Sequence, residues 1–210
     1  MDKFIVVAGN IGAGKSTLVR LLSDRLDFKP FYEPVSDNPY LADFYADMKK
    51  WAFHSQLYYL TRRLLIHKEL LSVAGSVIQD RSVYEDAEIF ARNLFLQGDI
   101  SKRDYNVYQD LYHILIKLLP PPNLIIYLQA NVETLEKRIA LRSRDYESNI
   151  PRIYLERLNI LYEEWMNSFT ESPILVIPCD SLNLVEDNTH IHKVIEAVRD
   201  KLTGRTVMHL

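Results

Sequence analysis

The chain has 210 residues, of which 25 are Lys or Arg and 28 are Asp or Glu, so its formal net charge is -3. Proteins that bind the phosphate backbone of nucleic acids are usually basic, and this charge argues against nucleic acid as the main partner. Hydrophobic residues make up 48% of the chain, yet no apolar run approaches the ~20 residues of a membrane span, so the composition is that of a globular domain.

The single cysteine, Cys179, cannot form a disulfide within the chain, which is typical of proteins in a reducing compartment. The apolar run at 4–8 is too short for the hydrophobic core of a secretory signal. We therefore expect a cytoplasmic protein without a membrane partner.

Short apolar, β-branched runs alternate with long helical patterns along the chain. Strands are predicted at 4–8, 28–33, 76–80, 124–128 and 174–177. Helices are predicted at 14–26, 38–49, 51–73, 83–97, 102–118, 131–143, 151–169 and 188–202. Strands that are buried on both faces and separated by helices imply a parallel sheet with right-handed crossovers. We therefore expect one α/β domain over 1–210, with about five parallel strands flanked by helices in three layers.

A complete phosphate-binding motif follows the first predicted strand directly. Gly9-Asn10-Ile11-Gly12-Ala13-Gly14-Lys15-Ser16 matches G-x-x-x-x-G-K-[ST]. The glycines let backbone N–H groups turn toward an anion, and the next helix adds the positive end of its dipole. Lys15 can then reach the β- and γ-phosphates of ATP, and the Ser16 hydroxyl can bind Mg²⁺. A glycine-rich turn with an incidental lysine is the alternative, but the flanking strand and helix favour a P-loop, and we include Thr17 in the ATP site.

The P-loop alone does not define the reaction. The N-K-x-D and D-x-x-G motifs of regulatory GTPases do not occur in the chain, and no apolar strand ends in the Asp-Glu pair of large ATPase motors. A small phosphoryl-transfer enzyme with a separate acceptor molecule remains.

Charged residues end two further predicted strands. Glu33 lies at the carboxyl end of the second strand, where parallel α/β sheets bind ligands. A carboxylate near phosphates is electrostatically unfavourable unless it accepts a proton, although a solvated loop glutamate is an equal alternative. Asp80 and Arg81 end the third strand, whereas Ser82 and Glu85 form a capping box for the next helix. Capping leaves Asp80 and Arg81 unexplained.

Two polar residues could line a pocket for a flat heterocycle. Gln56 and Arg63 lie two turns apart on the helix predicted at 51–73, beside its apolar stripe. Such residues are commonly the wet rim of a core, and the alternative is a pair of planar hydrogen-bonding groups that line a pocket. Asp86 falls in the first turn of the helix at 83–97, a position that the helix dipole favours in any case.

Arg138 and Arg142 are four residues apart on one predicted helix, and Arg144 follows closely. Like charges at this spacing repel by a few tenths of a kcal/mol, which indicates an anionic partner. A solvated arginine face neutralised by neighbouring acids is the alternative. Beside a P-loop we favour a lid at about 142–150 that closes arginines over the transferring phosphoryl group.

Together these segments resemble the deoxynucleoside kinase family, and most closely its bacterial deoxyadenosine and deoxyguanosine kinases. The resemblance extends from the N-terminus to about Trp165. Its matching stretches are Gly9–Ser16, Tyr32–Val35, Asp37–Tyr40, Trp51–Gln56 with Arg63, Asp80–Asp86, Leu124–Leu128 and Arg138–Glu147. It implies a three-layer P-loop kinase fold, ATP with Mg²⁺ as the phosphoryl donor, and a homodimer, for which the helices at 51–73 and 102–118 could supply the interface.

The resemblance also implies roles for single residues on the acceptor side. Glu33 is similar to the general base for the nucleoside 5′-hydroxyl, and Arg81 to the residue that steadies that base and the product phosphate. Asp80 is similar to an acidic residue near Mg²⁺. Tyr45 and Glu147 resemble the pair that holds the sugar 3′-hydroxyl.

Further roles follow from the same resemblance. The family's base-reading trio corresponds to Gln56, Arg63 and Asp86. The lid arginines resemble Arg142 and Arg144, and Arg138 is similar to the arginine near the donor adenine. A loop around the donor base is expected near 180–187.

We therefore expect ATP-dependent phosphorylation of the 5′-hydroxyl of a deoxynucleoside in nucleotide salvage. The Gln56 amide can flip to suit several bases, whereas an ionised Asp86 only accepts hydrogen bonds and needs a base N–H. Deoxyadenosine is the expected substrate and deoxycytidine a candidate second one, with deoxyguanosine as the alternative. A monophosphate kinase of the thymidylate type and a non-catalytic nucleotide-sensing module are weaker alternatives.

Overall fold

The computed structural model describes residues 2–32, 38–142, 150–182, 188–199 and 204–208. The chain divides into two compact units by its internal contacts. Unit 1 comprises 1–33, 70–81 and 121–210, and unit 2 comprises 34–69 and 82–120.

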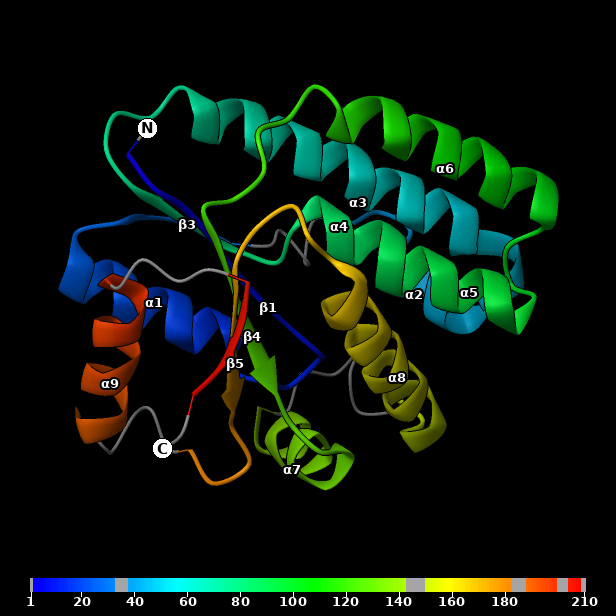
Figure 1. The fold of residues 1–210 in the computed structure, drawn as a ribbon. Helices are drawn as coiled ribbons and strands as arrows, with labels where there is room; N and C mark the ends of the chain where they lie inside the picture. Colours follow the sequence, from blue (N-terminus) through cyan, green and yellow to red (C-terminus); the bar gives the residue numbers. More distant parts are fainter. Residues whose placement is uncertain (1, 33–37, 143–149, 183–187, 200–203, 209–210) are drawn as a thin grey trace. The chain divides into compact units, whose positions relative to one another are not determined.

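Unit 1 contains a six-stranded sheet in which every neighbouring pair is parallel (Figure 1). The strands are β1 (Phe4–Gly9), β2 (Lys29–Phe31), β3 (Val77–Asp80), β4 (Leu124–Gln129), β5 (Ile174–Pro178) and β6 (Arg205–Val207). Their order in the sheet is β2-β3-β1-β4-β5-β6. The predicted parallel sheet flanked by helices is confirmed.

The expected number of about five strands was one too low. The sixth strand, β6, has only three residues and contains Arg205 and Thr206, so it carries no apolar run for a sequence pattern to detect. It forms by pairing with β5, where Ile174 lies opposite Arg205.

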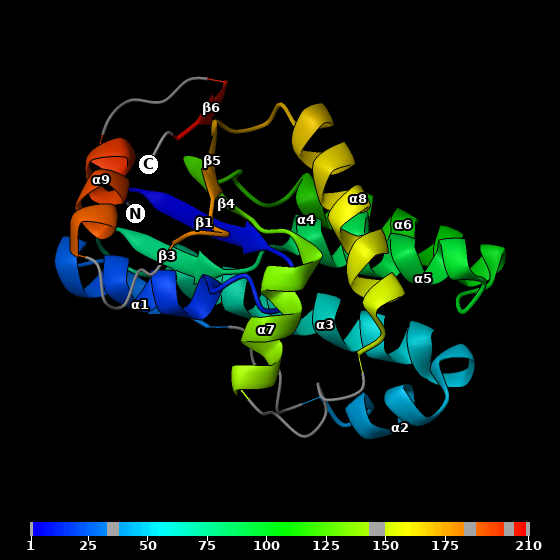
Figure 2. The ribbon, with the colours of Figure 1, turned by 90° about the horizontal axis from the view of Figure 1, so that it is seen from below.

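Four helices of unit 1 cover this sheet: α1 (Lys15–Leu26), α7 (Val132–Arg142), α8 (Arg152–Ser168) and α9 (Asn188–Arg199). Figure 2 shows α1 and α9 on one side of the strands and α8 on the other. Apolar side chains of α1, α7 and α9 pack with the inner strands in one core; Leu22, Leu135, Val194 and Ile126 are fully buried members of it. This packing fixes the carboxyl ends of β1 and β3, where the predicted phosphate site begins.

Unit 2 is helical. It holds α2 (Leu41–Ala46), most of α3 (Met48–Leu71), α4 (Val83–Glu85), η2 (Asp86–Ala91), α5 (Arg92–Gln97) and α6 (Lys102–Ile116). The helix predicted at 83–97 is continuous but winds as a π-helix through η2, and it ends at Gly98 with a left-handed φ of 83°. The capping box is present, because the Ser82 N–H donates to the Glu85 carboxylate at 2.8 Å.

Helix α2 is shorter than the predicted 38–49 helix. The Asn38 Oδ1 atom accepts the Tyr40 N–H at 2.9 Å, which forms a local turn before the helix. Within the described ranges, no helix has both the length and the hydropathy needed to cross a lipid bilayer.

Candidate functional site

The P-loop joins β1 to α1 and is pressed against α7. Gly12 has a φ of +82°, and a Cβ atom there would lie 2.9 Å from Ile139 Cγ1 and 3.0 Å from the Leu135 carbonyl oxygen. Only glycine avoids both this contact and the strain of a left-handed backbone. Gly14, with a φ of +99°, turns the chain into α1. These positions give the motif its phosphate-binding shape.

Side chains of the motif brace the loop from within. Lys15 is buried and its Nζ donates to the Asn10 carbonyl oxygen at 2.9 Å. The Asn10 amide is also buried; its Oδ1 accepts the Ile11 N–H at 2.7 Å, and its Nδ2 donates to the Leu155 carbonyl at 3.0 Å and to Asn159 Oδ1 at 2.7 Å. The loop is therefore anchored to α8, on which Leu155 and Asn159 lie one turn apart.

The two residues predicted to bind a metal ion lie together. Asp80 ends β3 directly beside β1, in register with Val7. Its Oδ2 accepts a hydrogen bond from Ser16 Oγ at 2.5 Å, and its side chain is buried. A carboxylate and a hydroxyl oxygen are the hard ligands that suit Mg²⁺. This pair of oxygens fits such an ion beside the P-loop.

Arg81 follows Asp80 in a strained conformation. It is a non-glycine residue with a φ of +66°, and its N–H donates to the Val7 carbonyl at 3.0 Å. Its guanidinium is buried and donates to the Tyr162 hydroxyl at 3.0 Å, which in turn donates to the Gly9 carbonyl at 2.8 Å. Strain of this kind gathers at functional sites because surrounding contacts hold it in place.

Arg138 of α7 donates hydrogen bonds to three backbone carbonyls. One guanidinium nitrogen donates to the Ala13 carbonyl at 3.1 Å, and another donates to the carbonyls of Cys179 at 2.6 Å and Leu182 at 3.2 Å. Arg138 thus joins the P-loop to the segment after β5. The Cys179 thiol is buried between them, and this burial raises its pKa.

The polar trio lies within unit 2 and is buried, which excludes the solvated-rim alternative. Arg63 of α3 and Asp86 of η2 form a two-point ion pair, with Nε to Oδ2 at 3.0 Å and Nη2 to Oδ1 at 3.4 Å. Asp86 therefore binds a guanidinium and is not explained by the helix dipole alone.

Gln56 Oε1 on α3 and the Tyr108 hydroxyl on α6 are buried polar atoms of unit 2 without a hydrogen-bond partner among the described residues. Burial and the nearby Asp86 carboxylate raise the pKa of Tyr108, so its hydroxyl stays protonated. A buried polar atom without a partner costs free energy, about 1–3 kcal/mol, which a ligand can recover. A polar ligand bound beside these two atoms would supply the missing partners.

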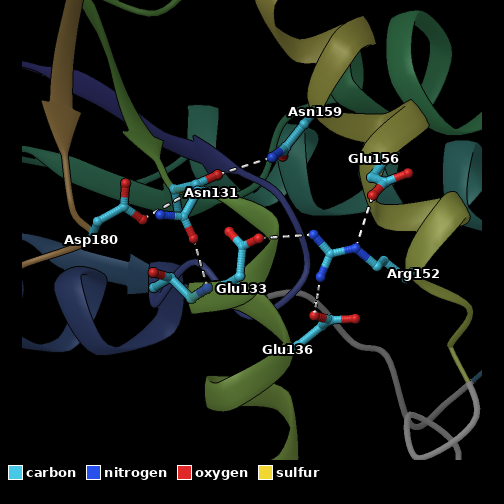
Figure 3. Close-up of polar contacts among 9 residues, drawn as sticks. Asn131, Glu133, Glu136, Arg152, Glu156, Asn159 and Asp180 are labelled. Atoms are coloured by element: carbon cyan, nitrogen blue, oxygen red, sulfur yellow. Dashed lines mark hydrogen bonds and ion pairs between the residues drawn. The ribbon is translucent and has the colours of Figure 1, made fainter.

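A polar cluster orders the two helices on either side of the predicted lid (Figure 3). Arg152, the first residue of α8, contacts Glu133 at 2.9 Å and Glu136 at 2.7 Å on α7, and Glu156 at 2.9 Å on its own helix. The Arg152 guanidinium lowers the pKa of the Glu133 carboxyl. At the start of α7, Asp180 accepts the Asn131 N–H at 2.8 Å.

The structure describes only some of the remaining predicted site residues. Arg142 is exposed at the end of α7, and Tyr45 on α2 is 39% exposed. Thr17 lies in the first turn of α1. Glu33, Arg144 and Glu147 lie outside the described residues, as do most of the predicted lid and donor-base loop.

The face of α8 that contacts the P-loop was not among the predicted site residues. Leu155, Asn159 and Tyr162 are spaced by four and three residues, which places them on one side of the helix. The signal was available, because Asn159 is a polar residue beside an otherwise apolar stripe. It pointed to a buried contact but not to its partner.

The comparisons with known proteins agree with this arrangement. The family model "Deoxynucleoside kinase" matches residues 5–203. A deoxyadenosine/deoxycytidine kinase of Bacillus subtilis is 37% identical over 199 residues, which covers 94% of this chain and 92% of the relative. A deoxyguanosine kinase of Lactobacillus acidophilus is 37% identical over 207 residues, covering 94% and 90% respectively.

A solved structure is similar over nearly the whole chain. The deoxyadenosine kinase of M. mycoides with bound dATP superposes with a TM-score of 0.83 at 32% identity, and covers 94% of this chain and all of its own. The chain therefore belongs to the deoxynucleoside kinase family, and the resemblance noted from its motifs is confirmed.

Proposed function

We propose that this chain transfers the γ-phosphoryl group of ATP to the 5′-hydroxyl of deoxyadenosine, for nucleotide salvage in the cytoplasm. The observation that carries the choice of acceptor is the buried set of Gln56, Arg63 and Asp86 in unit 2. A chain that only hydrolyses ATP has no use for a buried amide with an unsatisfied acceptor. Membership of the deoxynucleoside kinase family supports the same reaction.

The donor side of the reaction belongs to unit 1. We assign Lys15 to the β- and γ-phosphates and the P-loop N–H groups to the same oxygens. Ser16 and Asp80 would hold Mg²⁺, which neutralises charge on the phosphates when it is bound. Arg138 would lie beside the donor adenine, because it borders both the P-loop and the segment after β5.

The acceptor hydroxyl needs a base and charge stabilisation. We assign Glu33 as the general base that takes the 5′-hydroxyl proton, a role that contributes typically 10²–10⁴-fold to a rate. Arg81 would steady that carboxylate and the product phosphate, and Arg142 and Arg144 would cover the transferring group. Tyr45 and Glu147 would hold the sugar 3′-hydroxyl.

The proposed choice of base follows from the hydrogen-bond acceptors that the buried trio offers. Arg63 donates to both oxygens of Asp86, and a carboxylate can accept up to about four hydrogen bonds, so Asp86 can also accept from an exocyclic amine of the base. Gln56 Oε1 is a second buried acceptor in need of a donor. Adenine (N6) and cytosine (N4) each carry such an amine where guanine carries the carbonyl oxygen O6, so deoxyadenosine is the proposed substrate and deoxycytidine a second one. The M. mycoides relative, solved with dATP and with dCTP, supports this pair of bases.

The test measures kcat/KM for the four deoxynucleosides with ATP and Mg²⁺. We expect deoxyadenosine to be the best substrate, deoxycytidine to be phosphorylated more slowly, and EDTA to abolish turnover until Mg²⁺ is restored. Deoxyguanosine far ahead of deoxyadenosine would overturn the base assignment. Faster turnover of a nucleoside monophosphate, or tight ATP binding without any turnover, would overturn the kinase assignment.

We also propose a homodimer built on α6. Val107, Leu111, Ile114 and Leu118 recur at intervals of four, three and four residues along this helix and the turn after it. They are between 36% and 73% exposed, so unit 2 leaves an apolar stripe uncovered. Stripes of this kind mark protein–protein contacts when they are contiguous.

A further inference from the structure

The Arg81 guanidinium is connected to the P-loop through one phenol. Tyr162 lies on α8, is fully buried, and places its hydroxyl 3.0 Å from Arg81 Nη1 and 2.8 Å from the Gly9 carbonyl oxygen. Arg81 directly follows β3 and Gly9 ends the neighbouring strand β1, and all three residues belong to unit 1.

The direction of this chain of hydrogen bonds is forced by chemistry. A guanidinium can only donate and a carbonyl can only accept, so the Tyr162 proton must point to Gly9 and its lone pair to Arg81. Each bond polarises the next in a buried setting, which strengthens both. The phenol therefore fixes Arg81 Nη1 relative to the first residue of the phosphate-binding loop.

The phenol itself has little freedom. Its ring stacks on Tyr127 of β4, with centroids 5.7 Å apart and planes inclined by 15°, and it contacts Trp165 one turn further along α8. On the same face of α8, Asn159 and the Leu155 carbonyl hold the Asn10 amide. One helix face thus supports both the P-loop and the arginine beside it.

We infer that Tyr162 is a positioning residue for phosphoryl transfer, which acts by aligning the Arg81 side chain with the P-loop. This inference rests on the proposed function, in which Arg81 contacts the general base and the product phosphate. Because transfer depends on placement of charged groups to within fractions of an ångström, a loosened Arg81 should reduce kcat more than it reduces binding.

The test compares Tyr162→Phe with Tyr127→Phe. Both variants remove one hydroxyl from the same stacked, buried pair, but the Tyr127 hydroxyl donates to Glu163 at 3.0 Å and does not contact Arg81 or the P-loop. In this control variant, Glu163 still accepts the hydrogen bond that Gln129 Nε2 donates to it at 2.7 Å in the unmodified protein. We expect Tyr162→Phe to lower kcat about ten- to a hundredfold, with KM for ATP and nucleoside within about twofold, and Tyr127→Phe to stay within about twofold for all three constants.

A mutant cycle shows whether the effect passes through Arg81. In the Arg81→Ala background, we expect Tyr162→Phe to lower kcat by no more than about twofold, because the side chain that it aligns is gone. A full further decrease in that background would show that Tyr162 acts through the fold or through Gly9, and would overturn the inference. Equal losses in Tyr162→Phe and Tyr127→Phe would do the same.

An NMR measurement that does not depend on catalysis tests the role of Tyr162 separately from the proposed function. The Nη1–H signals of Arg81 in an NMR spectrum, assigned by their loss in Arg81→Lys, should exchange with solvent at least about tenfold faster in Tyr162→Phe and be unchanged in Tyr127→Phe. An unchanged Arg81 signal in Tyr162→Phe would refute the positioning role. Absence of nucleoside turnover in the unmodified protein would instead refute the proposed function, and the NMR result would still decide the role of Tyr162.

Discussion

Two non-glycine residues of the described chain have a left-handed backbone, and they do so for different reasons. Asp27 ends α1 at φ +55°, a common helix C-cap conformation. Arg81 at φ +66° caps no helix, and the conformation costs about 1–2 kcal/mol for an L-residue. The Val7 carbonyl and Tyr162 hydroxyl hold it, so the strain places a guanidinium at the end of β3 that an extended chain would direct elsewhere.

Substitution of Gly12 gives a prediction for a single residue of the P-loop. Gly12→Ala should weaken ATP binding at least about tenfold, because a Cβ 2.9 Å from Ile139 must displace the loop and its N–H donors. Calorimetric titration with ATP measures the loss.

Gly75→Ala is the matched control, since Gly75 has a similar φ of +91° with nothing within 4 Å of the added Cβ. Both variants should lose about 1–2 kcal/mol of unfolding free energy to backbone strain. Equal ATP affinity in the two variants would contradict the steric explanation.

Among the elements, α8 contacts both α7 and the P-loop. Its first residue, Arg152, pairs with two carboxylates of α7, and its middle turns hold Asn10 and Gly9. The ion pairs are 40–61% exposed, so each contributes little to global stability. They join the first turn of α8 to α7 and so hold these two helix ends together.

Helix α3 carries a buried histidine that makes stability depend on pH. Burial lowers the pKa of His67 from 6.5 to about 4. As the pH falls below 6.5, the unfolded chain takes up this proton before the folded chain does, so stability is lost between pH 6.5 and pH 4. The pKa difference corresponds to about 3 kcal/mol at most.

The variant His67→Gln cannot be protonated in this range and should show a flatter dependence of the urea midpoint on pH between 6.5 and 4. His192→Gln, at an exposed position on α9, is the control and should keep the steeper dependence of the unmodified protein. A slope that does not change in His67→Gln would assign the acid sensitivity to other groups.

At the scale of the whole molecule, the two units carry different parts of the proposed site. The residues proposed to bind phosphate lie in unit 1, where the sheet and its helices fix them, and the residues proposed to read the base lie in unit 2. Unit 2 also carries the exposed stripe of α6, so self-association would involve the helical unit.

Disruption of that stripe gives the prediction for the assembly. We expect the protein to have twice its monomer mass by light scattering at micromolar concentration, and Ile114→Glu to reduce this to the monomer, because a charge cannot be buried unpaired in an apolar contact. Leu96→Glu is the control, since Leu96 is also an exposed leucine but lies on α5 outside the stripe. A monomeric unmodified protein would refute the proposal.

Sequence patterns were most informative where local rules decide the structure. The P-loop, the capping box and the five predicted strands follow from local sequence patterns alone, and each is present. The strand β6 could not be predicted, because its backbone pairing with β5 and not its own residues creates it. The ion pair of Arg63 with Asp86 could not be predicted from residue spacing either, because 23 residues separate the two partners.

The role of α8 was hidden for a similar reason. Tyr162 and Gly9 are 153 positions apart, and nothing local in the helix indicates which carbonyl its phenol meets. Long-range hydrogen bonds of this kind depend on how the strands and helices pack together, which periodicity does not encode.

The two edge strands of the sheet, β2 and β6, are only three residues long, and this short length affects how the protein behaves in concentrated solution. An open strand edge is a template on which further chains can add and grow into fibrils. Here Lys29 and Pro30 occupy one border and Arg205 the other, so charge, a missing N–H donor and short length all oppose such growth. Concentrated solutions of the folded protein should therefore resist fibril formation.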